Sequence, residues 1–136
     1  MGAWQSYRLR LQRKRWRIRA FRKRRELSRV ADRTDQIRED DILMFCTLRN
    51  EKVRLPYFLD YYREMGVNHF IFVDNDSTDG TMDYLAEQPD VSVWHTRSSY
   101  KRSRFGADWL NWLQYKHAHG HWTLVLDPDE VLVYPF

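Results

Sequence analysis

The sequence predicts an α/β protein with a mostly parallel sheet between two layers of helices, preceded by a basic N-terminal helix. From residue 42 onward, short apolar runs alternate with helical patterns, which is the order of a β-α-β fold. Polar clusters follow three of the apolar runs, where ligands bind in open parallel sheets. Charge also divides the chain, with a net +9 over residues 1–40 and −5 over residues 41–136.

Length and composition limit the possible classes of protein. The 136 residues suffice for one modest domain, and 43% hydrophobic with 15% aromatic residues can form a core. Cys46 is the single cysteine, which excludes an intrachain disulfide and suits a reducing compartment. Apolar runs stay well short of the roughly 18 residues of a membrane span. We therefore expect a cytoplasmic protein, with peripheral attachment to the inner face of the membrane depending on the N-terminal segment.

Residues 1–38 are expected to form a basic helical arm and linker, and residues 39–136 the α/β domain. The arm is expected to be one helix from Trp4 to Val30, with a polar linker over residues 32–41. Its dense positive charge calls for an anionic partner. Interleaved aromatic residues favour an anionic membrane surface and make nucleic acid the less favoured partner. The alternative is that the arm packs on a missing half of the protein that this sequence does not contain.

The elements of the domain follow from local patterns taken in order. The apolar run 42–47 predicts a first strand, and Pro56 suits the first turn of a helix that Gly66 ends. The remaining predicted elements are a strand over 69–73, a helix over 81–88, a strand over 91–95, a helix over 103–119 and a strand over 122–126. The helix over 103–119 is expected to pack through Phe105, Trp109, Trp112 and Leu113.

Three polar clusters are expected to converge at one edge of the sheet because each follows a strand. They are Thr47-Leu48-Arg49-Asn50-Glu51, the run from Asp74 to Gly80, and Asp127-Pro128-Asp129-Glu130. Carboxylates two residues apart on a strand end point the same way, and such hard oxygen ligands suit Mg²⁺ or Mn²⁺ with phosphate oxygens. The last cluster therefore predicts a divalent metal held against a phosphorylated ligand.

The run from Asp74 to Thr78 also fits the DxDxT nucleophile motif of haloacid-dehalogenase-type phosphatases. The segment from Asp127 to Val131 fits the looser DxDxV form of the same motif. A phosphatase of this type needs one nucleophile strand followed by a downstream lysine and acidic pair. Two competing strands, with six residues after Glu130, argue against this alternative.

Taken together, the three clusters resemble those of family 2 glycosyltransferases of the GT-A fold, over residues 42–136. The resemblance implies the N-terminal half of such an enzyme, which binds a nucleotide-diphosphate sugar and uses Mn²⁺ or Mg²⁺. By that resemblance, the DxD motif is formed by Asp127 and Asp129, which contact the ribose and the metal-bound diphosphate. The expected nucleotide-sugar pocket further includes Thr47, Arg49, Asn50, Glu51, Asp74, Asn75 and Asp76. Arg104, next to Lys101 and Arg102, is a candidate phosphate contact.

The same resemblance places the acidic general base of inverting members beyond Phe136. We therefore expect a truncated chain that holds the donor-binding half, with a glycan or a lipid-linked molecule as acceptor of the complete enzyme. The alternative is an inactive remnant whose basic arm binds an anionic membrane or nucleic acid. The donor base, the sugar and the acceptor are not specified by these residues.

Overall fold

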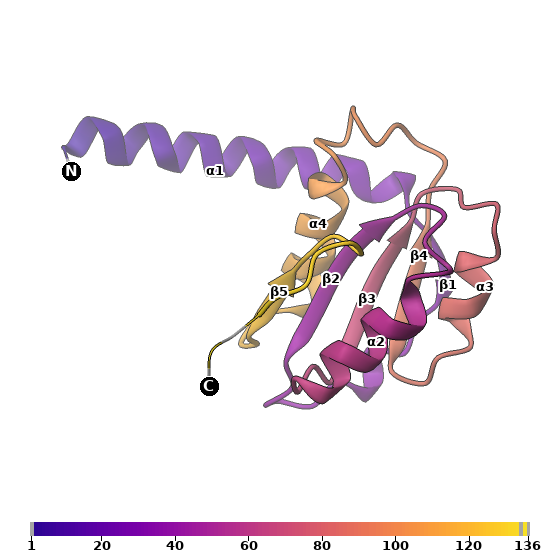
Figure 1. Ribbon diagram of the computed structural model, residues 1–136. Coiled ribbons are helices and arrows are strands. Elements are labelled where there is room, and N and C mark those ends of the chain that lie inside the picture. Colours follow the sequence, from indigo (N-terminus) through magenta and orange to yellow (C-terminus); the bar gives the residue numbers. More distant parts are fainter. Residues whose placement is uncertain (1, 134, 136) are drawn as a thin grey trace.

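The computed structural model describes residues 2–133 and 135, and its centre is a five-stranded sheet (Figure 1). The strands are β1 (Ser28–Ala31), β2 (Leu43–Leu48), β3 (His69–Asp74), β4 (Val91–His95) and β5 (Thr123–Val125). The α-helices are α1 (Ala3–Lys23), α2 (Leu55–Glu64), α3 (Thr81–Ala86) and α4 (Ala107–His117), with 3₁₀ turns η1 (Arg24–Glu26) and η2 (Thr34–Gln36). The strand order is β1-β4-β3-β2-β5, and every pairing except β1 with β4 is parallel. The predicted α/β class with a mostly parallel sheet is confirmed.

Two apolar cores, one on each face of the sheet, give the domain three layers. Alternate residues of β2 explain the division, because successive side chains of a strand point to opposite faces. Met44 and Cys46 belong to the core shared with α2 and α3, whereas Leu43 and Phe45 belong to the core shared with α4. The central strands β2 and β3 are buried along their whole length, as expected of strands covered on both faces.

The predicted end of the N-terminal helix is wrong. Helix α1 ends at Lys23, and residues 28–31, expected to be helical as far as Val30, form the antiparallel edge strand β1. Hydrogen bonds also attach the expected linker to the domain. The Arg33 guanidinium donates to the backbone oxygens of Val91 at 3.0 Å and Ala86 at 2.8 Å. The segment after the helix therefore completes the sheet edge beside β4.

The helix before β5 is shorter than predicted, beginning at Ala107 and ending at His117. Arg104 and Phe105 adopt positive φ angles of 56° and 57°, a left-handed conformation that a helix does not contain. Phe105 is 65% exposed, so its predicted place in the core is wrong. Trp109 and Leu113 are fully buried against the sheet, as predicted.

Helix α1 extends away from the domain and is attached only near its C-terminal end (Figure 1). Arg19 Nε lies 2.6 Å from a carboxylate oxygen of the buried Asp108, and the rings of Phe21 and Trp112 meet edge to face at 5.7 Å. Further along, Trp109 donates its indole N–H to Glu26 at 2.8 Å. Among the described residues, no helix combines the length and apolar character needed to cross a bilayer.

Candidate functional site

The carboxyl ends of β2 and β3 lie side by side because the two strands are parallel and in register. Leu48, the last residue of β2, pairs with Asp74, the last residue of β3. The backbone N–H of Asn75 then donates to the Leu48 oxygen at 2.9 Å. On the other side of β2, β5 runs parallel and leads directly to Asp127. The three predicted polar clusters thus leave the same edge of the sheet.

The loops after β2 and β3 are joined by hydrogen bonds between side chains and backbone. Asn50, which has a positive φ of 55°, accepts from Thr78 N–H at 2.7 Å and donates its own N–H to Ser77 Oγ at 2.8 Å. Asp79 accepts from Thr81 N–H at 3.0 Å, and hydrogen bonds from Thr81 lower the pKa of Asp79 against its desolvation. The contacts of Asn50 fix the two loops to each other, and the contact between Asp79 and Thr81 stabilises the second loop.

A pocket of about 330 Å³ lies between these loops and the segment after β5. It is lined by Thr47, Leu48, Arg49, Glu51, Asn75, Tyr100, Asp127, Pro128 and Asp129. Six of these residues come from the set that the sequence predicts for a nucleotide-sugar pocket, from all three clusters. Thr47 Oγ1 is buried and finds no hydrogen-bond partner among the described residues, so it can accept or donate a bond to a ligand.

The acidic motif forms a turn that α2 holds in place. Asp127 N–H donates to the Glu130 carboxylate at 3.0 Å, and Glu130 N–H donates to the Asp127 carbonyl oxygen at 3.0 Å. The hydroxyl of Tyr62 donates to the Glu130 carbonyl oxygen at 3.0 Å and accepts from Leu132 N–H at 2.9 Å. A buried helix residue therefore positions the backbone that presents Asp127 and Asp129.

Negative charge accumulates at this turn. Partial desolvation, together with the charges of Glu130 and Asp129, raises the pKa of Asp127 above its usual value of 3.8. The nearest counter-charge is Arg54, whose guanidinium lies 4.0 Å from Asp129 and 3.6 Å from Glu51. A cation bound beside Asp127 would relieve the repulsion that raises its pKa.

The donor chemistry of Asp127 and Asp129 fits Mg²⁺ or Mn²⁺. These ions bind hard oxygen ligands and commonly use one or two carboxylates together with water and phosphate oxygens. Within residues 2–133 and 135, no cluster of three or more His, Cys, Asp or Glu side chains is arranged to hold a metal. A pair of carboxylates completed by a diphosphate does not require such a cluster.

Four predicted site residues do not line the pocket. Asn50 joins the two loops, and Asp76 faces His95 at 3.2 Å and Arg97 at 3.5 Å. Arg104 lies 3.7 Å from Asp108 and places its guanidinium 4.4 Å from the ring centre of Trp16, so it serves the junction with α1.

The fourth residue, Asp74, is fully buried behind the pocket and accepts from Ser77 N–H at 3.0 Å. A fully buried carboxylate is not accessible as a nucleophile, which disfavours the phosphatase alternative at this strand. Its Oδ1 finds no hydrogen-bond partner among the described residues.

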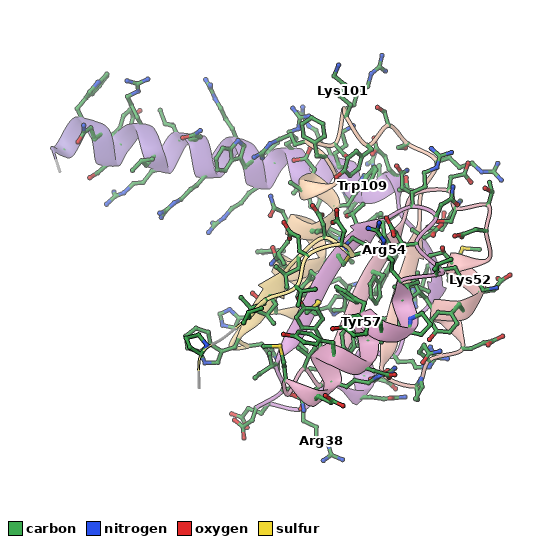
Figure 2. The ribbon with its side chains drawn as sticks, viewed as in Figure 1. Arg38, Lys52, Arg54, Tyr57, Lys101 and Trp109 are labelled. Carbon is green, nitrogen blue, oxygen red and sulfur yellow. The ribbon has the colours of Figure 1, made fainter. Side chains whose placement is uncertain are left out.

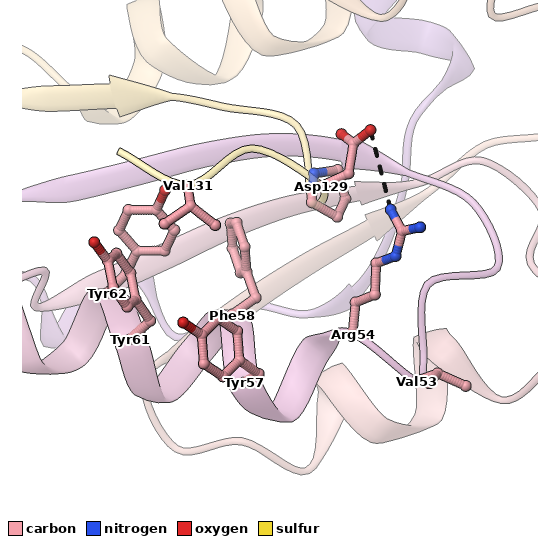
Figure 3. A pocket seen from close by; sticks show the side chains of 9 residues that line it. Val53, Arg54, Tyr57, Phe58, Tyr61, Tyr62, Asp129 and Val131 are labelled. Atoms are coloured by element: carbon pink, nitrogen blue, oxygen red, sulfur yellow. Dashed lines mark ion pairs between the residues drawn. The ribbon is translucent and has the colours of Figure 1, made fainter. Parts of the chain in front are cut away.

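A second pocket of about 440 Å³ shares Pro128 and Asp129 with the first (Figure 3). Its other lining residues are Val53, Arg54, Tyr57, Phe58, Tyr61, Tyr62 and Val131. The rings of Tyr57 and Tyr61 stack at 5.9 Å, and Tyr57 is 66% exposed. The Asp129 loop therefore separates a polar pocket from an aromatic one.

Sequence reasoning missed two residues of the site. Tyr100 lines the first pocket from the loop after β4, where desolvation followed by the charge of Asp127 raises its pKa. The sequence offered one signal for Tyr100, which is an aromatic residue among the basic residues that follow the predicted strand over 91–95. Arg54 precedes α2 and reaches Asp129, a contact between residues 75 positions apart that local patterns do not reveal.

Neither a scan against protein-family models nor a search of curated protein sequences finds a match for this chain.

Proposed function

We propose that this chain binds a nucleotide-diphosphate sugar and supplies the donor site of a metal-dependent glycosyltransferase of the GT-A type. The observation that carries the proposal is the convergence of three strand-end clusters on one pocket of about 330 Å³. The resemblance to family 2 glycosyltransferases rests on the same three clusters, in the same order along the chain. The proposal extends to a glycan or a lipid-linked molecule as acceptor.

The pocket supplies groups suited to a nucleoside. Thr47 offers a hydroxyl and Asn75 its amide oxygen, since the Asn75 amide nitrogen donates to two backbone oxygens. Arg49 and Glu51 offer charged groups at the rim. Tyr100 adds an aromatic ring, which can pack against a base or a ribose. Polar groups of this kind fix orientation, while the apolar and aromatic surface contributes most of the buried area.

Asp127 and Asp129 would hold the metal ion at the open side of the pocket. When bound, Mg²⁺ or Mn²⁺ would neutralise the charge of a diphosphate as it leaves the sugar, which is worth several kcal/mol in such reactions. The chain's own contribution is the fixed turn, since Glu130 and Tyr62 hold the backbone on either side of the carboxylates. Pro128 between them restricts the turn further.

The aromatic pocket across Asp129 is the proposed position for the acceptor. It adjoins the metal-binding carboxylates, and its exposed Tyr57 offers a flat ring of the kind that sugar rings pack against. A sugar bound in the first pocket would meet an acceptor at the shared residues Pro128 and Asp129.

Calorimetric titration with UDP-, GDP- and dTDP-sugars in the presence of Mn²⁺ tests the proposal. We expect one nucleotide class to bind, and Thr47→Val to weaken binding about fivefold by removing one hydrogen-bonding hydroxyl. Thr123→Val, the same change at the amino end of β5, is the matched control and should leave affinity unchanged. Absence of binding by all three nucleotide classes would refute the donor site.

A further inference from the structure

We propose that α1 is a docking helix for anionic phospholipid surfaces. This inference is independent of the donor site, because it rests on the helix that extends from the domain (Figure 1). The helix contains nine Lys and Arg residues and no Asp or Glu between Ala3 and Lys23. Among the described residues, Arg8, Arg10 and Arg15 form no ion pair, and all three are exposed. Their charge is available to an external anionic partner.

An apolar stripe runs along the same helix. At 100° per residue, Trp4, Tyr7, Leu11 and Ile18 fall within about 60° of arc. All four are exposed, Trp4 by 71% and Tyr7 by 54%, and the rings of these two residues stack at 6.0 Å. The stripe is narrow, and cationic side chains flank it on both sides, as in helices that lie in a bilayer interface.

The N-terminal part of the stripe lies beyond the contacts that attach the helix to the domain, which are made by Trp16, Arg19, Ala20 and Phe21. Ala20 is the buried residue of α1, and the guanidinium of Arg104 covers the ring of Trp16. On the helical wheel these two positions lie roughly opposite the stripe. The domain therefore does not compete with a lipid surface for Trp4, Tyr7 and Leu11.

The combination of charge and exposed aromatic residues favours a lipid surface over nucleic acid. Affinity for a nucleic-acid backbone comes mainly from cations that neutralise phosphates, a contribution that does not require an apolar stripe. A bilayer interface uses both features, since cations attract anionic headgroups while Trp and Tyr rings enter the headgroup region. The occupant that matches both is a bilayer containing anionic phospholipid.

Docking would also set the orientation of the domain. The loop between β4 and α4 touches α1 through the Arg102 carbonyl oxygen, which accepts from Arg19 at 2.5 Å. The same loop carries Tyr100, which lines the 330 Å³ pocket. A helix lying on the bilayer would therefore hold this loop, and the pocket that Tyr100 lines, at a fixed position relative to the surface.

Flotation of the full chain with phosphatidylcholine vesicles, with and without phosphatidylglycerol, tests the proposal. We expect binding only to the anionic vesicles. The triple variant Arg8→Gln, Arg10→Gln and Arg15→Gln should lower affinity about 100-fold, given the attraction of each cation to an anionic surface. The matched control removes equal charge from the exposed domain residues Arg38, Lys52 and Lys116, two of which are labelled in Figure 2. This control should bind like the wild type.

A second pair of variants separates lipid from nucleic acid. Trp4→Ala with Tyr7→Ala should lower vesicle affinity about tenfold or more through lost apolar burial. The control is Trp122→Ala with Tyr115→Ala, because both residues are exposed on the domain, by 84% and 73%. Absence of binding to anionic vesicles, equal losses in variants and controls, or tighter binding to an oligonucleotide than to vesicles at one ionic strength would overturn the proposal.

Discussion

Gly106 lies so close to Thr47 that a β-carbon added at Gly106 would be 2.6 Å from Thr47 Oγ1. Gly106 also has a φ of +80°, which side chains rarely adopt. Thr47 lines the candidate pocket from the end of β2, and Gly106 directly precedes α4, the helix on the face of the sheet toward which Thr47 points. The packing of α4 is thus coupled to the shape of the pocket.

Gly106→Ala should destabilise the protein by about 1–3 kcal/mol beyond the cost of its backbone conformation, because the methyl group overlaps a buried side chain. Gly120→Ala is the matched control. Gly120 has a φ of +81° and nothing within 4 Å of an added β-carbon, so this variant reports the backbone cost alone. Urea unfolding of both variants measures the difference, and equal losses of stability would contradict the close packing.

Arg54→Gln should increase the affinity for Mn²⁺ about two- to fivefold. The guanidinium lies 4.0 Å from Asp129 and competes with a metal cation for that carboxylate, with the strength of an exposed ion pair. Arg38→Gln, which removes one exposed charge on the far side of the domain, controls for net charge (Figure 2). Titration of free Mn²⁺ by electron paramagnetic resonance provides the measurement, and unchanged affinity would show that Arg54 does not oppose the metal.

Glu130→Gln should lower the pKa of Asp127. Desolvation and then the Glu130 and Asp129 charges raise this pKa above 3.8 in the folded protein. Ionisation of Asp127 therefore costs folding stability as pH rises from 3.8 through the raised pKa, and the variant should reduce that cost. A glutamine can still accept the Asp127 N–H. Carbon-13 NMR of the side-chain carboxyl group follows the titration, and an unchanged pKa would contradict the proposed repulsion.

Stability should decline as the pH is lowered below 6.5. Burial lowers the pKa of His69, whose ring lies 2.9 Å from Ser92 Oγ, so the unfolded chain takes up a proton that the folded chain resists. Stability therefore rises with pH between the lowered pKa and 6.5. His69→Gln should reduce this slope in thermal unfolding midpoints between pH 5 and 7. An identical slope in the variant would assign the effect to other groups.

Arg63→Lys should destabilise the domain by about 1 kcal/mol. Two guanidinium nitrogens each lie 2.7 Å from one oxygen of Asp90, a fork that links α2 to the turn before β4. Lysine keeps the charge and loses the paired geometry. Arg38→Lys serves as the exposed control. Chemical unfolding that gives the same stability for both variants would refute a structural role for the fork.

The sheet and its helices were predictable because apolar runs such as 69–73 and the Pro56 helix start are local signals. Strand β1 was missed because residues 28–31 follow a strongly helical segment and owe their strand conformation to pairing with β4. Residues 103–106 were assigned to the following helix because their turn depends on Gly106 packing against the distant Thr47 side chain. Long-range contacts of this kind leave no local pattern.

The candidate site was likewise predictable only in part. The clusters after β2, β3 and β5 were predictable because parallel strands end at one edge. The sequence did not reveal which cluster members line the pocket, because Asp74 and Asn75 are adjacent and only Asn75 lines it. Arg104 was expected near a phosphate because of its basic neighbours. Its guanidinium instead lies over the ring of Trp16, a contact that depends on how α1 packs on the domain.

In the proposed donor site, Asp127 and Asp129 bind a metal ion that holds a nucleotide-diphosphate sugar. The most direct test is the donor affinity in Mn²⁺ and in EDTA for the wild type, Asp129→Asn and the control Asp40→Asn, an exposed aspartate outside the site. We predict that EDTA and Asp129→Asn each weaken donor binding about 100-fold, whereas Asp40→Asn has no effect. Donor binding that is the same in EDTA and in Asp129→Asn as in the wild type with Mn²⁺ would contradict the claim.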